Sequence, residues 1–163
     1  MSVFRVFLVL MLLGSLSACS KFPTYHGPEV TRVVVYKERH QMYLLHHDTV
    51  LKSYRIALGF APEGHKKFQG DGKTPEGDYI IDRRNPNSNF YLSIGISYPN
   101  TDDLAHAKAA GRDPGGDIFI HGGRRRGDPK RADWTAGCIS VPDRHMRTIY
   151  SMVRNGTPIT IHP

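Results

Sequence analysis

Apolar and polar residues alternate over short stretches through most of the chain, a pattern typical of β-strands. The clearest alternation places Phe90, Leu92, Ile94 and Ile96 on one face of a strand. Between these stretches stand Gly, Pro, Asn and Asp residues, which favour turns. The sequence therefore predicts strands at residues 32–37, 41–46, 49–58, 78–82, 90–97, 117–121, 135–141 and 158–162.

Two stretches late in the chain are predicted to be helical. Residues 104–110 follow Thr101 and two aspartates, which suit the first turn of a helix. After Pro142, apolar residues recur at helical spacing, at Met146, Ile149, Tyr150 and Val153. No glycine fingerprint of a nucleotide-binding βαβ unit follows a strand. The expected fold is mainly β with one or two helices, in one domain at residues 31–163.

The first residues have the outline of a signal peptide. Arg5 precedes an apolar run at residues 6–13, far shorter than the roughly 20 residues that span a bilayer. The following Leu-Ser-Ala-Cys, ending at Cys19, resembles the lipoprotein signal of bacteria. That resemblance implies a signal peptide at residues 1–18, lipidation of Cys19 and a tether at 19–30. It also implies a periplasm-facing lipoprotein, and Ser20 favours the outer membrane. An ordinary cleavable signal is the alternative.

Charge and cysteine content limit the classes of partner that the protein can have. Lys and Arg number 22 against 15 Asp and Glu, a net charge of +7, which favours an anionic partner. Export disfavours nucleic acid and leaves a membrane surface or the cell wall. The two cysteines cannot form a disulfide scaffold, and lipidation of Cys19 would leave Cys138 as an unpaired thiol.

Cys138 and His121 are the candidate catalytic pair. His121 ends a predicted strand where a long loop begins, and Cys138 follows Gly137 in another predicted strand. If these strands are adjacent, the imidazole can take the thiol proton and hold a thiolate as an ion pair, which attacks a carbonyl carbon. Backbone N–H groups around Ala136, Gly137 and Cys138 are candidate donors to the resulting oxyanion. Burial of each residue for purely structural reasons is the alternative.

These residues resemble the catalytic domain of the L,D-transpeptidase (YkuD-type) family. The resemblance lies in His121-Gly122, then Thr135-Ala136-Gly137-Cys138-Ile139-Ser140, with Thr-Pro-Glu-Gly-Asp-Tyr at 74–79 and Gly-Thr-Pro-Ile at 156–159. It implies a β-sandwich or barrel, peptidoglycan as partner, and neither cofactor nor metal. It also implies that the Gly122 carbonyl orients His121. The Thr-Ala-Gly-Cys form and the small size are most similar to the short YafK-like branch.

The sequence departs from the family pattern at two positions. Ala136 stands where many members have His, and Ser140 stands where many have an Arg suited to a substrate carboxylate. Arg124 or Arg131, in the loop at 122–134, could take that role. Thr135, Ser140 and Trp134 are further candidates for binding substrate. The alternatives are a solvated loop and a Trp134 that serves only packing.

The resemblance implies acyl transfer on stem peptides through a Cys138 thioester, forming 3–3 crosslinks or protein–wall links. Hydrolysis of stem-peptide or lipoprotein–wall bonds, by a carboxypeptidase or amidase activity, is one alternative. A monomeric wall-binding lipoprotein without catalysis is the other.

Overall fold

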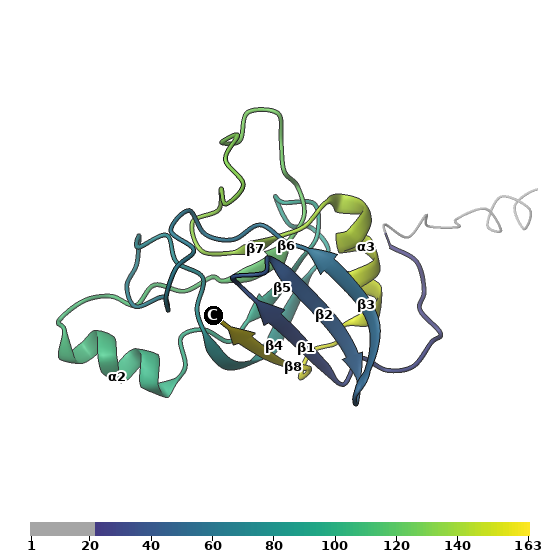
Figure 1. Cartoon of the computed structure of the whole chain (residues 1–163), viewed down its shortest axis with the longest axis horizontal. Helices are drawn as coiled ribbons and strands as arrows, with labels where there is room; N and C mark the ends of the chain where they lie inside the picture. The colour runs from purple at the N-terminus through teal and green to yellow at the C-terminus, as the bar shows by residue number, and fades with distance from the viewer. Residues whose placement is uncertain (1–21) are drawn as a thin grey trace, which may run out of the picture.

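The computed structural model describes residues 22–163, which form a curled eight-stranded sheet with two helices (Figure 1). The strand order is β3-β2-β1-β8-β4-β5-β6-β7. The strands are β1 (Arg32–Tyr36), β2 (Gln41–His46), β3 (Thr49–Arg55), β4 (Gly77–Asn85), β5 (Ser93–Ile96), β6 (Phe119–His121), β7 (Ile139–Ser140) and β8 (Pro158–His162), and the helices are α2 (Thr101–Ala109) and α3 (Asp143–Met152). The predicted mainly β fold is confirmed.

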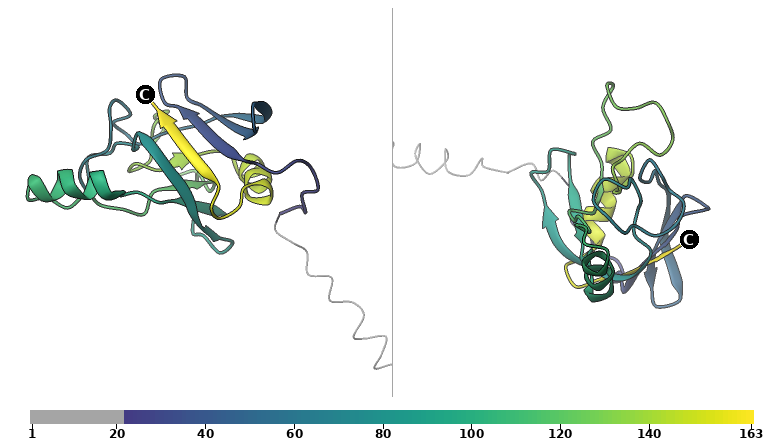
Figure 2. Two further views of the ribbon diagram at one scale, coloured as in Figure 1. Left: turned by 90° about the horizontal axis from the view of Figure 1, so that it is seen from below. Right: turned by 90° about the vertical axis from the view of Figure 1, so that its left-hand side faces the viewer.

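Strands β1, β2 and β3 form the predicted antiparallel meander. The turns between them place His40 and His47 at φ values of 49° and 50°, in the left-handed region. Strand β8 lies between β1 and β4, parallel to β1 and antiparallel to β4 (Figure 2). It therefore joins the early meander to the second half of the sheet.

The two ends of the sheet approach each other through the segment after β3. Ala57 and Ser140 exchange backbone N–H···O hydrogen bonds of 2.9 and 2.8 Å. The N–H of Phe60 donates to the carbonyl of Thr135 at 2.9 Å, and the N–H of Thr135 donates to the carbonyl of Leu58. These bonds curl the sheet toward a barrel and hold β7 in place.

The hydrophobic core fills the inside of the curled sheet. Its fully buried side chains include Met42, Leu44, Ile94, Ile120 and Ile159. Helix α3 covers the core with residues at the spacing seen in the sequence, including Met146, Ile149 and Tyr150. Burying these apolar faces removes each side chain from water, which stabilises the fold.

Helix α2 extends away from the sheet (Figures 1 and 2). Asn100 caps it, accepting from the N–H groups of Asp102 and Asp103, while the Asp103 carboxylate accepts from the N–H of Asn100. This capping box satisfies backbone donors that a helix start leaves unpaired. Asp103 also accepts hydrogen bonds from Tyr79 and His65, which tie the helix to the domain.

Several predicted strands are longer than the observed ones. Strand β5 begins only at Ser93, because Tyr91 has φ +75° and the Phe90 side chain is 44% exposed. All four residues of β5 are buried, so it is not the half-buried strand that its alternation predicted. Strand β3 ends at Arg55 instead of residue 58. Residues 135–138 are not strand, and only Ile139–Ser140 remain of the predicted 135–141.

The predicted signal peptide at residues 1–18, Cys19 and Ser20 lie outside the described residues. The described part of the predicted tether packs against the domain. The Phe22 ring lies 4.6 Å from the Tyr150 ring of α3, centroid to centroid. Tyr25 is partly buried against the core, and Val30 is 2% exposed.

Candidate active site

Two short parallel strands, β6 and β7, bring His121 close in the fold to the turn that carries Cys138. In the register of β6 and β7, Ile120 is opposite Ile139 and His121 is opposite Ser140. Because side chains alternate along a strand, the buried isoleucines point into the core, while His121 and Ser140 point to the other face. Cys138 lies directly before β7, and its Sγ lies 3.5 Å from the carbonyl oxygen of Asp117, just before β6. The predicted pair is thus divided between the end of β6 and the turn that leads into β7.

A tight turn before β7, rather than a strand, presents Cys138. The Thr135 hydroxyl donates to the carbonyl of Cys138 at 2.6 Å and accepts from the N–H of Gly137 at 3.2 Å. Gly137 has φ +136°, and a Cβ there would lie 2.8 Å from the carbonyl oxygen of Lys73. Glycine is therefore needed at 137. Thr135 is 5% exposed, and its hydroxyl holds the turn instead of facing solvent.

The His121 ring is fixed by one hydrogen bond and two aromatic neighbours. Its Nδ1 lies 2.7 Å from the carbonyl oxygen of Gly122. A carbonyl only accepts, so Nδ1 carries the proton and Nε2 of the neutral ring is left as the base. The rings of Phe90 and Trp134 lie 4.6 and 5.8 Å from the imidazole, centroid to centroid. Trp134 is thus a packing partner of His121.

Burial keeps both groups of the pair neutral. It lowers the pKa of His121 from its ordinary 6.5, although the hydrogen bond to Gly122 and the Asp128 charge act in the opposite direction. It raises the pKa of the Cys138 thiol from 9.0, opposed by the N–H of Phe119 and the charge of Lys66. At neutral pH the resting site therefore holds a thiol and a neutral imidazole, not the ion pair expected from the sequence.

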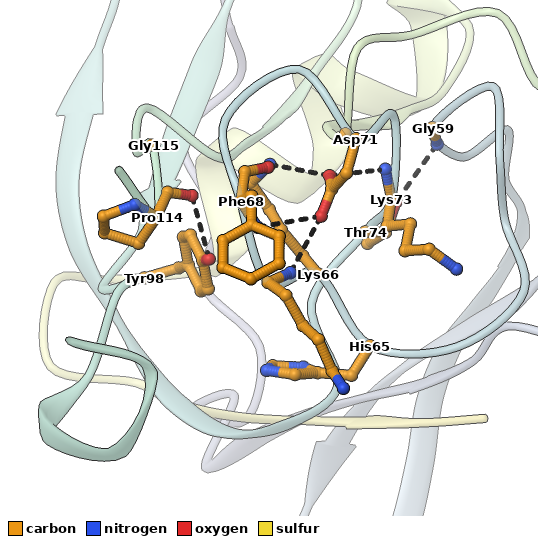
Figure 3. Close-up of polar contacts among 12 residues, drawn as sticks. Gly59, His65, Lys66, Phe68, Asp71, Lys73, Thr74, Tyr98, Pro114 and Gly115 are labelled. Atoms are coloured by element: carbon orange, nitrogen blue, oxygen red, sulfur yellow. Dashed lines mark hydrogen bonds and ion pairs between the residues drawn. The ribbon is translucent and has the colours of Figure 1, made fainter. Parts of the chain in front are cut away.

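A folded loop at residues 59–76 packs against the turn that carries Cys138. Figure 3 shows Asp71 at its centre, accepting from the ammonium of Lys66 at 3.0 Å and from the N–H groups of Lys67, Phe68 and Lys73. Lys66 is 3% exposed. It also donates to the carbonyl of Phe68 at 2.9 Å.

The 59–76 loop contacts the turn through glycines. A Cβ on Gly59 would lie 2.9 Å from Cα of Gly137, and the Gly59 N–H donates to Thr74 Oγ1 at 3.1 Å. Sequence reasoning missed this supporting role of Lys66 and Asp71. The sequence pattern that could have indicated this role is an acid five residues after a lysine, in a loop with glycines at 64, 70 and 72. The structure gives these glycines positive φ values.

The arginines expected to bind substrate are both engaged in contacts within the domain. The Arg124 guanidinium donates to the carbonyls of Pro129 and Arg131 and lies 5.6 Å from the Trp134 ring centroid. That of Arg131 lies 5.0 Å from the Phe60 ring centroid. The 122–134 loop rises above the sheet between β6 and β7 (Figure 1). Arg124 is thus held within its own loop, whereas Arg131 contacts the 59–76 loop.

A cleft of about 790 Å³ adjoins Ser140 and Trp134. Its basic lining includes Arg55, Arg124 and Arg144. Sequence reasoning singled out neither Arg55 nor Arg144, since they come from β3 and α3, far from the Gly-Cys motif in the chain. Only the curling of the sheet brings them beside Ser140.

Two further observations concern residues 22–163 as a whole. No group of three or more His, Cys, Asp or Glu side chains there is arranged to hold a metal ion. Neither helix in that range has the length and apolar character needed to cross a membrane.

Comparison with known proteins agrees with this geometry. The family model for the L,D-transpeptidase catalytic domain, YkuD, matches residues 30–161. The chain therefore belongs to the L,D-transpeptidase catalytic-domain family.

Among individual proteins, the chain is similar to "Putative L,D-transpeptidase YafK" of Escherichia coli (strain K12), with 39% identity over 75 residues. That match covers 45% of this chain and only 28% of the relative. A crystal structure of the helical cell shape determining protein Pgp2 (K307A mutant) from Campylobacter jejuni has a TM-score of 0.63 and 25% identity, over 87% of this chain and 50% of that one. Mycobacterium tuberculosis L,D-transpeptidase 1 shares the fold, with a TM-score of 0.52 and 14% identity, over 83% of this chain and 62% of that one.

Proposed function

We propose that this protein is a cysteine acyltransferase that acts on peptidoglycan stem peptides. The observation that carries the proposal is the placement of Cys138 directly before β7, the strand that pairs with β6 and its last residue His121, with Nε2 of His121 available as base. Family membership supports the same chemistry. The presence of both residues argues against a purely wall-binding role.

In the proposed reaction, Nε2 of His121 takes the thiol proton as Sγ of Cys138 attacks the carbonyl carbon of the third stem residue. The tetrahedral intermediate collapses, the bond to the terminal D-Ala nitrogen breaks, and His121 protonates the leaving amine. A thioester remains on Cys138. An acceptor amine attacks it, giving its proton to His121, and the Cys138 sulfur leaves and is reprotonated. Water in place of the amine gives hydrolysis.

The oxyanion of the intermediate needs donors near Sγ. The N–H of Gly137 is already donated to Thr135 Oγ1. The backbone N–H groups of Ala136 and Cys138 are therefore the better candidates among those expected from the sequence. Thr135 acts in this proposal by positioning the turn, and Gly122 by orienting His121.

The decisive experiment compares the full-length protein in detergent with its Cys138→Ala variant. Each is incubated with tetrapeptide muropeptides and with sacculi that carry linked lipoprotein, and products are identified by mass. We expect 3–3 crosslinks or protein–wall links and a transient thioester mass on wild-type Cys138. Shortened stems or released lipoprotein would instead identify a hydrolase. Absence of products and of the thioester in the wild type would contradict both enzymatic functions.

We also propose that Cys19 is lipidated and anchors the protein, as a monomer facing the periplasm, to the outer membrane. Three residue steps separate Cys19 from Phe22, a reach of about 11 Å at most. Because Phe22 packs on α3, the domain would lie beside the membrane. Metabolic labelling with a fatty-acid analogue, followed by membrane fractionation, tests this. A Cys19→Ser variant that keeps the label would contradict it.

A further inference from the structure

The cleft beside Ser140 is lined by neither Cys138 nor His121, but two of its lining residues lie next to them. Ser140 is opposite His121 in the β6–β7 register and follows Cys138 by two residues. Trp134, which also lines the cleft, packs edge-on against the imidazole. A substrate whose carbonyl carbon lies at Sγ of Cys138 can therefore continue along β7 into the cleft.

The charges around this cleft are predominantly positive. Three arginines line it, at Arg55, Arg124 and Arg144, against one acid, Asp143. The acid is already engaged, since its Oδ1 accepts from the N–H of Gly123 at 2.5 Å. The fourth basic group, His40, is paired with Asp133 at 2.9 Å. The arginines that line the cleft thus outnumber its single carboxylate by three to one.

Arg55 and Arg144 are the arginines best placed to meet a ligand. Arg55 ends β3 with an exposed side chain that has no hydrogen-bond or ion-pair partner among the described residues. Arg144 is exposed in the first turn of α3, and its Nε contacts only His145 Nε2, at 3.3 Å. The guanidinium of Arg124, by contrast, donates to two carbonyls of its own loop.

We propose that this cleft binds a carboxylate of the peptide substrate through Arg55 and Arg144. The inference rests on the proposed function for its ligand, a peptide with free carboxylates. A guanidinium is charged at every relevant pH and matches the planar carboxylate in shape. The two arginines would thereby hold the part of the substrate that lies on the Ser140 side of the scissile bond. They would supply the positive charge that is missing at Ser140, where many family members have an Arg.

The test measures binding without turnover, in the Cys138→Ala background of the full-length protein. The probes are a stem tetrapeptide with free carboxylates and the same peptide with its carboxylates converted to amides, titrated by calorimetry. Arg55→Gln and Arg144→Gln are compared with Arg147→Gln, a matched control because Arg147 is exposed on the same helix outside the cleft. Urea unfolding midpoints show whether each variant is folded.

We expect each cleft variant to bind the carboxylate peptide about tenfold more weakly, since charged hydrogen bonds contribute this much. Their affinity for the amidated peptide should match that of the parent, and Arg147→Gln should bind both as the parent does. Arg55→Lys should retain part of the affinity. Equal affinity of the parent for both peptides would overturn the proposal, as would no saturable binding or an equal loss in the control.

The result is separable from the proposed function. If the wild-type enzyme turns over substrate and the cleft variants bind the peptide as the parent does, the carboxylate site is contradicted and the proposed enzymatic function stands. If the cleft variants lose carboxylate-dependent binding but the wild-type protein never forms a thioester, the carboxylate site is supported and the proposed enzymatic function is contradicted.

Discussion

At the scale of single residues, burial decides how the catalytic pair begins its reaction. A buried imidazole resists protonation, and a buried thiol resists loss of its proton, so the pKa of His121 falls while that of Cys138 rises. The proton must then move during attack, with His121 as general base. As the sulfur–carbon bond forms, the thiol proton passes to His121 and the negative charge develops on the carbonyl oxygen.

This protonation state predicts a wide pH plateau for acyl transfer. Activity should fall below a pH that is itself under 6.5, where His121 becomes protonated and cannot accept. It should fall again above pH 9.0, where the thiol proton needed by the leaving amine is lost. A profile of kcat/KM against pH measures both limbs.

Alkylation by iodoacetamide in a Cys19→Ser background checks the same point independently. Its rate at Cys138 should still be rising at pH 9, with free glutathione as the reference thiol. A rate already constant from pH 6 upward would reveal a preformed ion pair and contradict the neutral one.

Gly137 carries a second prediction at this scale. An alanine there must adopt φ +136° and place its Cβ 2.8 Å from the Lys73 carbonyl, so Gly137→Ala should lose about 1–3 kcal/mol of unfolding free energy. Urea denaturation measures the loss. Gly116→Ala is the matched control, because a Cβ at that site meets no atom within 4 Å. Equal midpoints for the two variants would show that the turn can move aside.

At the scale of elements, the 59–76 loop behaves as a folded unit built around one carboxylate. Burial raises the pKa of Asp71, but hydrogen bonds from three N–H groups and Lys66 lower it further, so the pKa lies below its ordinary 3.8. The folded state thus favours the ionised form. The stabilisation is present above pH 3.8 and is lost as the pH falls through the folded-state pKa.

Asp71→Asn should therefore lose about 1–3 kcal/mol of unfolding free energy at pH 7, because an amide cannot accept all four bonds and leaves Lys66 buried without its partner. The difference from wild type should be constant above pH 5 and shrink below pH 3.8. Urea unfolding across that pH series measures it. Asp48→Asn, at an exposed turn, is the control. A difference independent of pH would rule out the carboxylate as the cause.

The elements also show what a sequence can and cannot predict here. Strands β2 and β8 have the predicted bounds, and the spacing of Met146, Ile149 and Tyr150 correctly predicted the face that α3 buries. For these elements, the local pattern of apolar and polar residues was enough to predict the structure. The pattern failed at 135–138, because a side-chain hydroxyl and a left-handed glycine replace strand pairing.

The candidate site divides in the same way. The motif around Cys138 was visible in the sequence because its residues are near neighbours in the chain. Arg55 and Arg144 were not visible, because only the pairing of Ala57 with Ser140 brings their elements together. Lys66 looked like one of several loop lysines, and its burial depends on the fold of the whole loop.

At the scale of the whole molecule, the curled sheet is closed by the bonds between Ala57 and Ser140. If these bonds are part of the cooperative fold, the amides of both residues should exchange hydrogen as slowly as those of β1 and β8. Hydrogen exchange followed by NMR measures this, with the exposed amide of Gly127 as the fast reference. Exchange of Ser140 at the rate of Gly127 would mean that the active-site end opens independently.

Strand β8 has a consequence for the order of folding. Residues 158–162 are needed between β1 and β4, so until that segment has emerged the early meander is joined to the catalytic half only through the bridges of Ala57 with Ser140 and of Gly59 with Thr135. During synthesis, most of the pairing across this junction must wait for β8. Such late, long-range pairing slows folding. For the exported protein proposed above, that delay would keep the chain unfolded until β8 has emerged.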